Sequence, residues 1–299
     1  MHSHVDLILE SRWKRLRKRW KAPEYDKESF VKRLYDSSVT ERGISFFNPW
    51  LPIFDEGCFW LKIERDLFDE WSTDVAPSPL TGVSFLVHKA LTEALSFRLL
   101  IVAGYEDSAG IVLRAMMETL DLALLLFTDK ALAEHYWADF EVDEPSTFWT
   151  DHLSKGRMAK RLETIVGQVS IKREHLKAIA AHRSDVFTKL SERVHSSLTA
   201  SLRSYAHPSL EQPGLYSTSP FGRLSAHAPS LMTVAYDYIG THGDILIASV
   251  LQEITPFVVD TDKRREGFVG LVARWNLLQE ISDLFKRDRK RLERALKLT

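Results

Sequence analysis

The chain has 299 residues and a mass of 34.4 kDa, a length that suits one large domain or two small ones. Hydrophobic residues make up 44% and charged residues 27%, so the chain can bury a core and is not a disordered tail. The 40 Lys and Arg and the 41 Asp and Glu leave a net charge of −1. This balance excludes a wholly basic nucleic-acid-binding protein, although not a local basic patch. The single cysteine, Cys58, excludes an internal disulfide framework and any zinc site built from several cysteines.

Residues 1–75 are expected to form an N-terminal helical arm and an aromatic packing segment. Apolar residues recur at steps of four, three and four, which places them on one face of a helix: Leu9, Trp13, Leu16 and Trp20. Residues 43–60 are aromatic and are interrupted by Pro49, Pro52 and Gly57, so we expect an irregular packed segment there. The sequence VAPSPLTG at 75–82 joins this part to the rest of the chain.

Residues 76–299 are expected to form the main helical bundle. Helical spacing of apolar residues predicts helices over 83–102, 108–127, 130–141, 153–166, 231–255 and 263–298, with one or two more within 172–204. The first two are joined by a turn at 103–107, which makes them a helical hairpin. Residues 206–230 hold four prolines and predict a long loop. With no convincing alternating strand, the predicted fold class is all-α: a helical bundle with an N-terminal arm and a long basic C-terminal helix.

No targeting segment or membrane span is expected. The most apolar stretch, 109–128, carries charged side chains that a lipid-embedded helix would not tolerate. We therefore expect a cytoplasmic protein.

Basic residues gather at the two ends of the chain. Residues 12–21 carry +7 and residues 286–297 carry +5, so the remainder carries −13. Three interpretations stay open: solvated helix faces, ends that pair with acidic surface within or between subunits, and a footprint for nucleic acid. The second favours a homodimer, and the third makes Arg12, Arg15 and Lys18 candidate substrate-binding residues.

The most informative charged residues lie in the predicted helix 108–127. This helix is apolar on nearly every side and should be buried, yet Arg114, Glu118 and Asp121 follow one another at steps of four and three on one face. Buried charges are costly unless they are paired. Arg114 and Glu118 can pair directly, and we expect further partners from another helix.

A second polar pair lies at 185–198, where Ser191 and His195 flank an apolar stripe and lean inward. Histidine exchanges protons near neutral pH. If this helix packs beside 108–127, His195 faces Arg114 and Glu118. No metal or cofactor is expected, because the Glu-x-x-His spacing of Glu192 and His195 has no second copy.

These two segments resemble a family of uncharacterised bacterial all-helical proteins, a domain of unknown function. The resemblance covers about 84–200 and rests on Gly104, Tyr105, Glu106, Asp107, Ala109, Leu113, Arg114, Glu118, Leu190, Ser191, His195, Ser196 and Ser197. That family is in turn distantly similar to the HEPN superfamily, which includes many ribonucleases and toxins of conflict systems.

The resemblance implies a HEPN-like effector, a metal-independent ribonuclease or toxin in phage defence. It makes Arg114, Glu118 and His195 the candidate catalytic residues and Asp121 and Ser191 candidate substrate contacts. The Arg-x4–6-His spacing of HEPN ribonucleases is absent here, so Arg114 would have to meet His195 from another helix. The alternative is a non-catalytic interaction module, with a protein partner, in which the same network only fixes helix register.

Overall fold

The computed structural model describes eleven stretches of the chain and one single residue, Ile44. The described residues are 14–19, 44, 47–48, 50–73, 79–138, 147–154, 156–169, 183–191, 207–208, 216–217, 228–252 and 262–296. Of the last stretch, most side chains beyond Ile281 are outside the description.

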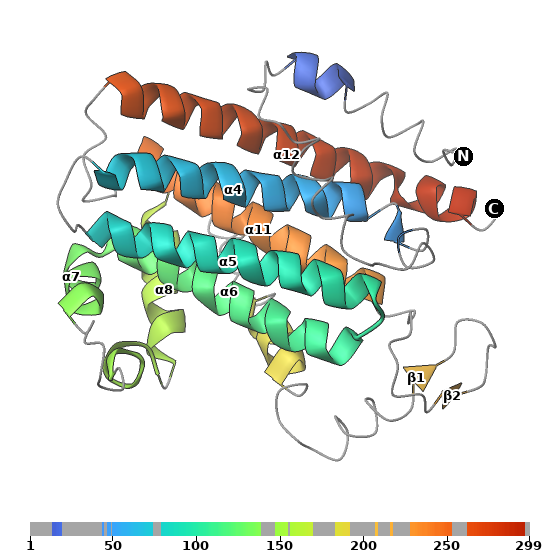
Figure 1. Cartoon of the computed structure of the whole chain (residues 1–299), viewed down its shortest axis with the longest axis horizontal. Helices are drawn as coiled ribbons and strands as arrows, with labels where there is room; N and C mark the ends of the chain where they lie inside the picture. Colours follow the sequence, from blue (N-terminus) through green and yellow to red (C-terminus); the bar gives the residue numbers. More distant parts are fainter. Residues whose placement is uncertain are drawn as a thin grey trace.

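Five long helices form the bundle. They are α4 (Leu51–Thr73), α5 (Pro79–Val102), α6 (Glu106–Thr128), α11 (Ala228–Leu251) and α12 (Asp262–Leu296). Figure 1 shows α12, α4, α5 and α6 side by side in that order, with α11 packed behind them against α4, α6 and α12. The predicted all-α fold is confirmed for the described residues, apart from a two-residue strand pair, β1 (His207–Pro208) with β2 (Tyr216–Ser217), in the segment predicted to be a loop.

The hairpin of α5 and α6 is confirmed, and a left-handed glycine closes it. Gly104 has φ of +80°, a conformation that favours glycine. The Tyr105 amide donates to the Leu100 carbonyl and the Gly104 amide to the Ile101 carbonyl. This is the hydrogen-bond pattern that commonly ends a helix with glycine, and it turns the chain back so that α6 packs along α5.

The prediction of an irregular segment over 43–60 is wrong from residue 51 onward, where α4 begins. Pro52 lies in the first turn, where a backbone N–H has no partner within the helix. Gly57 lies mid-helix at a close contact, and a Cβ there would meet Ile239 at 3.4 Å. Helix α4 contacts α5, α11 and α12, so residues 51–73 pack within the same helical bundle as those helices.

Shorter elements follow α6. They are α7 (Lys130–Ala138), the π-helical turn η1 (Trp149–Leu153), α8 (Arg157–Gln168) and the helical residues 183–191. The helix expected over 153–166 is thus two elements, separated at Gly156, whose φ is +80°. Among the helices predicted within 172–204, only 183–191 belong to the described residues.

Buried ion pairs tie the long helices together. The Arg98 guanidinium on α5 donates to the Asp55 carboxylate on α4, with Nε 2.6 Å from Oδ1, and both side chains are at most 4% exposed. Arg274 on α12 pairs with Glu56 on α4, and His242 on α11 lies 2.8 Å from Glu64 on α4. Such pairs fix which helix faces meet, because removal of one partner leaves a buried charge.

Cys58 lies in this core and is fully buried. Burial raises the pKa of its thiol, and the nearby Asp55 carboxylate adds to the rise. In this environment the thiol stays protonated and unreactive.

Among the described helices, none combines the length and the apolar character that a membrane span requires.

A close contact between helices gives a stability test at Gly243 on α11. A Cβ there would lie 2.8 Å from Trp275 Cδ1 and 3.2 Å from Trp60 Cζ2, so Gly243→Ala should lower the unfolding free energy by about 1–3 kcal/mol. Gly240→Ala is the matched control, because a Cβ at Gly240 meets only Gln279 Nε2 at 3.6 Å. It should instead stabilise the helix by about 0.5–1 kcal/mol. Denaturant unfolding measures both changes, and equal effects would contradict the packing.

Candidate functional site

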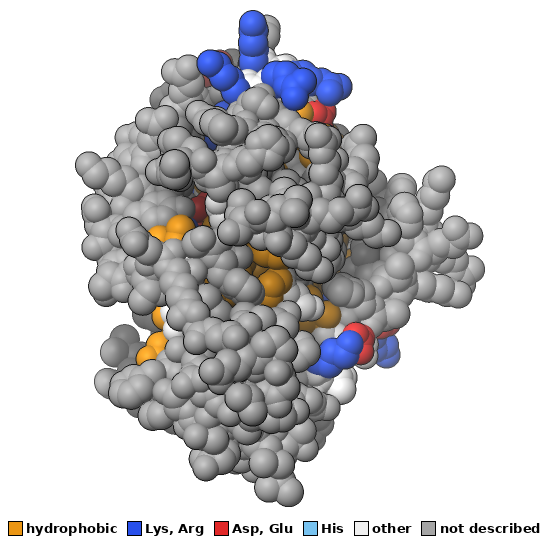
Figure 2. All heavy atoms as spheres, turned by 90° about the vertical axis from the view of Figure 1, so that its right-hand side faces the viewer, with side chains coloured by type: hydrophobic (Ala, Val, Ile, Leu, Met, Phe, Trp, Pro, Cys, Tyr) orange, Lys and Arg blue, Asp and Glu red, His pale blue; other side chains and the backbone are white. Residues whose placement is uncertain are grey.

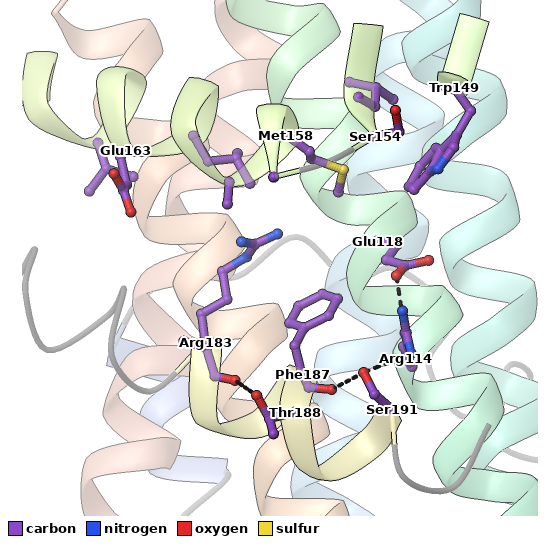
Figure 3. A pocket seen from close by; sticks show the side chains of 16 residues that line it. Arg114, Glu118, Trp149, Ser154, Met158, Glu163, Arg183, Phe187, Thr188 and Ser191 are labelled. Carbon is purple, nitrogen blue, oxygen red and sulfur yellow. Dashed lines mark hydrogen bonds and ion pairs between the residues drawn. The ribbon is translucent and has the colours of Figure 1, made fainter. Parts of the chain in front are cut away.

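A pocket opens where the shorter elements cover α6. Its volume is about 820 Å³, and its walls come from α6, η1, α8 and the helical residues 183–191 (Figure 3). Ligand pockets in proteins commonly enclose roughly 300–1,000 Å³. The pocket is therefore large enough for a small organic molecule or for one unit of a polymer.

One wall is the apolar face of α8. Met158, Leu162 and Val166 recur every fourth residue and line the pocket, whereas Arg157, Lys160 and Arg161 on other faces of the helix are polar. This amphipathic pattern predicts a helix that lies on a core. Here part of the apolar face borders the pocket instead, so a ligand with an apolar body can replace water against it.

The η1 turn adds an aromatic side chain to the rim. Trp149 lines the pocket and is 43% exposed. The Arg157 guanidinium holds the turn against the start of α8 by donating to the carbonyls of Thr150 and Asp151, at 2.8 and 2.7 Å. These bonds fix the backbone that presents Trp149.

Arg114 joins the charged face of α6 to Ser191, in the second segment with predicted site residues. Its Nε donates to Glu118 Oε1 at 3.1 Å, and its Nη1 donates to Ser191 Oγ at 2.8 Å. The Ser191 hydroxyl in turn donates to the Phe187 carbonyl at 2.6 Å. The Arg114 and Glu118 side chains are 25% and 28% exposed, so the pair lies at the pocket wall, neither sealed in the core nor free in solvent.

Arg183 also lines the pocket, although it was not among the predicted site residues. Its Nε lies 2.9 Å from Asp121 Oδ2 and 3.1 Å from the Tyr238 hydroxyl, and its Nη2 also donates to Asp121. Its Cζ lies 4.6 Å from the centre of the Phe187 ring. A signal was present in the sequence, because Arg183, Phe187 and Ser191 recur every fourth residue and so share one helix face.

Asp121 lies behind the pocket rather than in its wall. Its carboxylate is buried and accepts hydrogen bonds from Arg183 and from the Tyr238 hydroxyl. Burial raises the pKa of Asp121, which the Arg183 guanidinium opposes. Burial also raises the pKa of Tyr238, and the adjacent Asp121 carboxylate adds to that rise. Asp121 thus binds Arg183 and does not line the pocket, where a substrate contact was predicted.

Desolvation is the largest single influence and lowers the pKa of Arg183, but the attraction and hydrogen bonds of Asp121 and Tyr238 together outweigh it, so the net shift is upward. The guanidinium therefore stays charged at every pH at which the protein is folded.

Two of the other predicted site residues, Arg15 and Lys18, do not line the pocket. His195 and Arg12 lie outside the described residues. Arg15 and Lys18 are exposed in the helical residues 14–19, which lie beyond α12, on the side of the bundle opposite α8 (Figure 1). Figure 2 shows Lys and Arg side chains gathered at that edge of the molecule.

Two cations of the basic N-terminal segment pair within the chain. Arg17 lies 3.0 Å from Glu56, and Arg19 lies 3.3 Å from Glu280. These contacts favour pairing within one subunit over a free nucleic-acid footprint for this part of the segment.

The chemistry of the pocket follows from its donors. Arg114 Nη2 and Arg183 Nη1 make no hydrogen bond among the described residues, so both guanidinium groups can still donate to an anionic ligand. Within the described stretches, no group of three or more His, Cys, Asp or Glu could hold a metal ion. The pocket thus offers two arginine donors for an anion beside apolar and aromatic side chains, and two carboxylates, Glu118 and Glu163, also line it.

The two charged pairs differ in burial and should differ in their effect on stability. Asp121→Ala removes a buried carboxylate from Arg183 and Tyr238 and should lower the unfolding free energy by about 3–5 kcal/mol. Arg114→Ala breaks a partly exposed pair and one hydrogen bond and should cost about 1 kcal/mol. Urea unfolding followed by circular dichroism measures both. A larger loss for Arg114→Ala would show that Arg114, not Asp121, holds the helices together.

Comparison with known proteins finds no family model that matches the chain, and no curated protein or solved structure that is significantly similar to it.

Proposed function

We propose that the protein is a HEPN-like helical effector that acts on RNA at the Arg114 side of the pocket, as a metal-independent ribonuclease or toxin in phage defence. One observation carries the proposal. The hydrogen bond from Arg114 to Ser191 joins two residues that are 77 positions apart, and both belong to the segments on which the resemblance rests. A cytoplasmic location agrees with an RNA substrate.

The proposed cleavage uses only groups of the protein and the RNA. Arg114 holds the scissile phosphate, because a guanidinium can donate two hydrogen bonds to phosphate oxygens. The ribose 2′-hydroxyl loses its proton to His195 and attacks the adjacent phosphorus. The bond from phosphorus to the 5′-oxygen breaks and the proton returns to that oxygen, which leaves a 2′,3′-cyclic phosphate and a 5′-hydroxyl. His195 follows Ser191 by four residues in the sequence.

The cavity beside Arg114 suits an unpaired nucleotide. Trp149 and Phe187 line it, and aromatic side chains stack on bases of any identity. Met158 and Leu162 give the apolar remainder of the wall.

RNA incubation tests the proposal. The wild-type protein should cleave transfer RNA or total RNA, and the variant Arg114→Ala/His195→Ala should lose at least about 100-fold in rate, the scale of a lost general acid–base group. Product analysis should find cyclic phosphate ends, and a chelator should not inhibit. Lys189→Ala is the matched control, because Lys189 lies on the same helix as Ser191, pairs with Asp185 and does not line the pocket. Identical RNA patterns for wild type and double variant would end the proposal.

A second candidate is a non-catalytic interaction module with a protein partner. The network of Asp121, Arg183 and Tyr238 favours it, because these residues join three helical segments and would be needed for packing alone. In either case we propose a homodimer, since basic chain ends complement an acidic body.

The two candidates differ in what His195 contributes. If His195 belongs to a structural network, His195→Ala should lower the unfolding free energy by about 1–3 kcal/mol, because a buried polar partner is orphaned. If it serves catalysis, the same variant should keep its stability and lose activity. Thermal unfolding of wild type and variant, measured beside a cellular toxicity assay, separates the two outcomes.

A further inference from the structure

We infer that Arg183 is a second phosphate-binding residue of the pocket, and that Asp121 and Tyr238 are positioning residues that hold its guanidinium toward the cavity. The inference rests on the proposed function, since it names a further contact for RNA in the same pocket. No motif in the sequence includes Arg183.

The nitrogens of the Arg183 guanidinium face two different surroundings. Two of its nitrogens, Nε and Nη2, donate to Asp121 and Tyr238 on the protein side. The third, Nη1, makes no hydrogen bond among the described residues, and the side chain is 19% exposed at the pocket wall. Figure 3 shows this group reaching into the cavity toward α8. One end of Arg183 is therefore fixed while the other is open to a ligand.

The Arg183 guanidinium is held in place by its neighbours. Asp121 Oδ2 accepts from Arg183 and Oδ1 accepts from the Tyr238 hydroxyl, so the carboxylate is held from two sides. The Phe187 ring packs against the guanidinium, with Cζ 4.6 Å from the ring centre. A donor held in place before the ligand arrives loses little conformational entropy on binding.

A second arginine–aspartate pair in the same protein differs from this one in the burial of its cation. Arg98 and Asp55 form an ion pair of the same kind between α4 and α5, but Arg98 is fully buried and lines no part of the pocket. That pair serves packing alone. The pair of Arg183 with Asp121 differs because its carboxylate is buried and its guanidinium reaches the cavity, so the pocket is lined by the cation of this pair and not by its anion, although Glu118 and Glu163 line other parts of the wall.

The position of Arg183 relative to Arg114 gives it a distinct role. Figure 3 shows the two arginines on opposite sides of Phe187. A nucleotide whose base stacks on Phe187 would thus find a guanidinium donor on either side. We assign Arg114 to the scissile phosphate and Arg183 to a phosphate of the neighbouring nucleotide.

The test measures binding separately from cleavage. The probe is a fluorescein-labelled single-stranded oligoribonucleotide with 2′-O-methyl groups, which cannot react, and its affinity is measured by anisotropy at several salt concentrations. The variant Arg183→Gln/Asp121→Asn removes both charges of the pair, so that no buried carboxylate is left unpaired. It should bind about tenfold more weakly, and the slope of log K against log salt should fall by about 0.7, the value for one phosphate contact on a single strand. A purely structural role would not change this slope.

Tyr238→Phe tests positioning and remains informative if the double variant does not fold. It removes only the hydroxyl that holds Asp121 and Arg183, so the probe should bind several-fold more weakly with an unchanged salt slope, because the charge remains. Lys189→Gln is the control for a general charge effect. Lys189 is an exposed cation on the same helix, and its loss should leave both affinity and slope near those of the wild type.

The outcomes separate this inference from the proposed function. The role of Arg183 is overturned if Arg183→Gln/Asp121→Asn and Tyr238→Phe both keep the affinity and salt slope of the wild type. It is also overturned if Lys189→Gln weakens binding as much as the Arg183 variant does. RNA cleavage that depends on Arg114 and His195 would still stand in either case. Binding that depends on Arg183 without any cleavage would support Arg183 and overturn the ribonuclease. No binding of the probe by the wild type would overturn the inference.

Discussion

Asp121 on α6 constrains how the helical residues 183–191 and α11 pack against that helix. Asp121 lies in a helix whose apolar residues are almost all buried, and a carboxylate there needs a cation from another segment. Arg183 supplies that cation and Tyr238 adds a hydroxyl from α11, so the helical residues 183–191 and α11 both meet α6 at this point. The hydrogen bond from Arg114 to Ser191, two helical turns along the same short helix, is a consequence of this docking.

The ion pairs of this bundle fall into two kinds, buried pairs and pairs that border the pocket. The pair of Arg98 with Asp55 and the pair of Arg274 with Glu56 are closed and select which faces of α4, α5 and α12 pack together. The pairs that involve Arg114 and Arg183 border a cavity, and each leaves one guanidinium nitrogen for a ligand. The difference is burial of the cation: 4% or less of the Arg98 and Arg274 side chains is exposed, against 25% for Arg114 and 19% for Arg183.

The candidate site was only partly predictable. Arg114, Glu118 and Ser191 were found because charges at helical spacing within an apolar helix are unusual, and the structure brings these three together. Asp121 does lie on the same face of α6 as Arg114, two turns further along, but there Arg183 and the Tyr238 hydroxyl cover its carboxylate and bury it. Arg183 and Trp149 were missed because no local pattern shows that they border a cavity, although the spacing of Arg183 from Ser191 places both on one helix face.

The sequence by itself determined the helical class and most of the helix limits, because apolar spacing and glycine or proline punctuation act within one or two turns of the chain. It placed the α5–α6 hairpin correctly, yet it underestimated α4, whose proline lies where a helix tolerates one. Only the tertiary structure decided which charges pair and which border a cavity. Ion pairs such as Arg183 with Asp121 join residues 62 positions apart, and their geometry depends on how whole helices pack rather than on any local pattern.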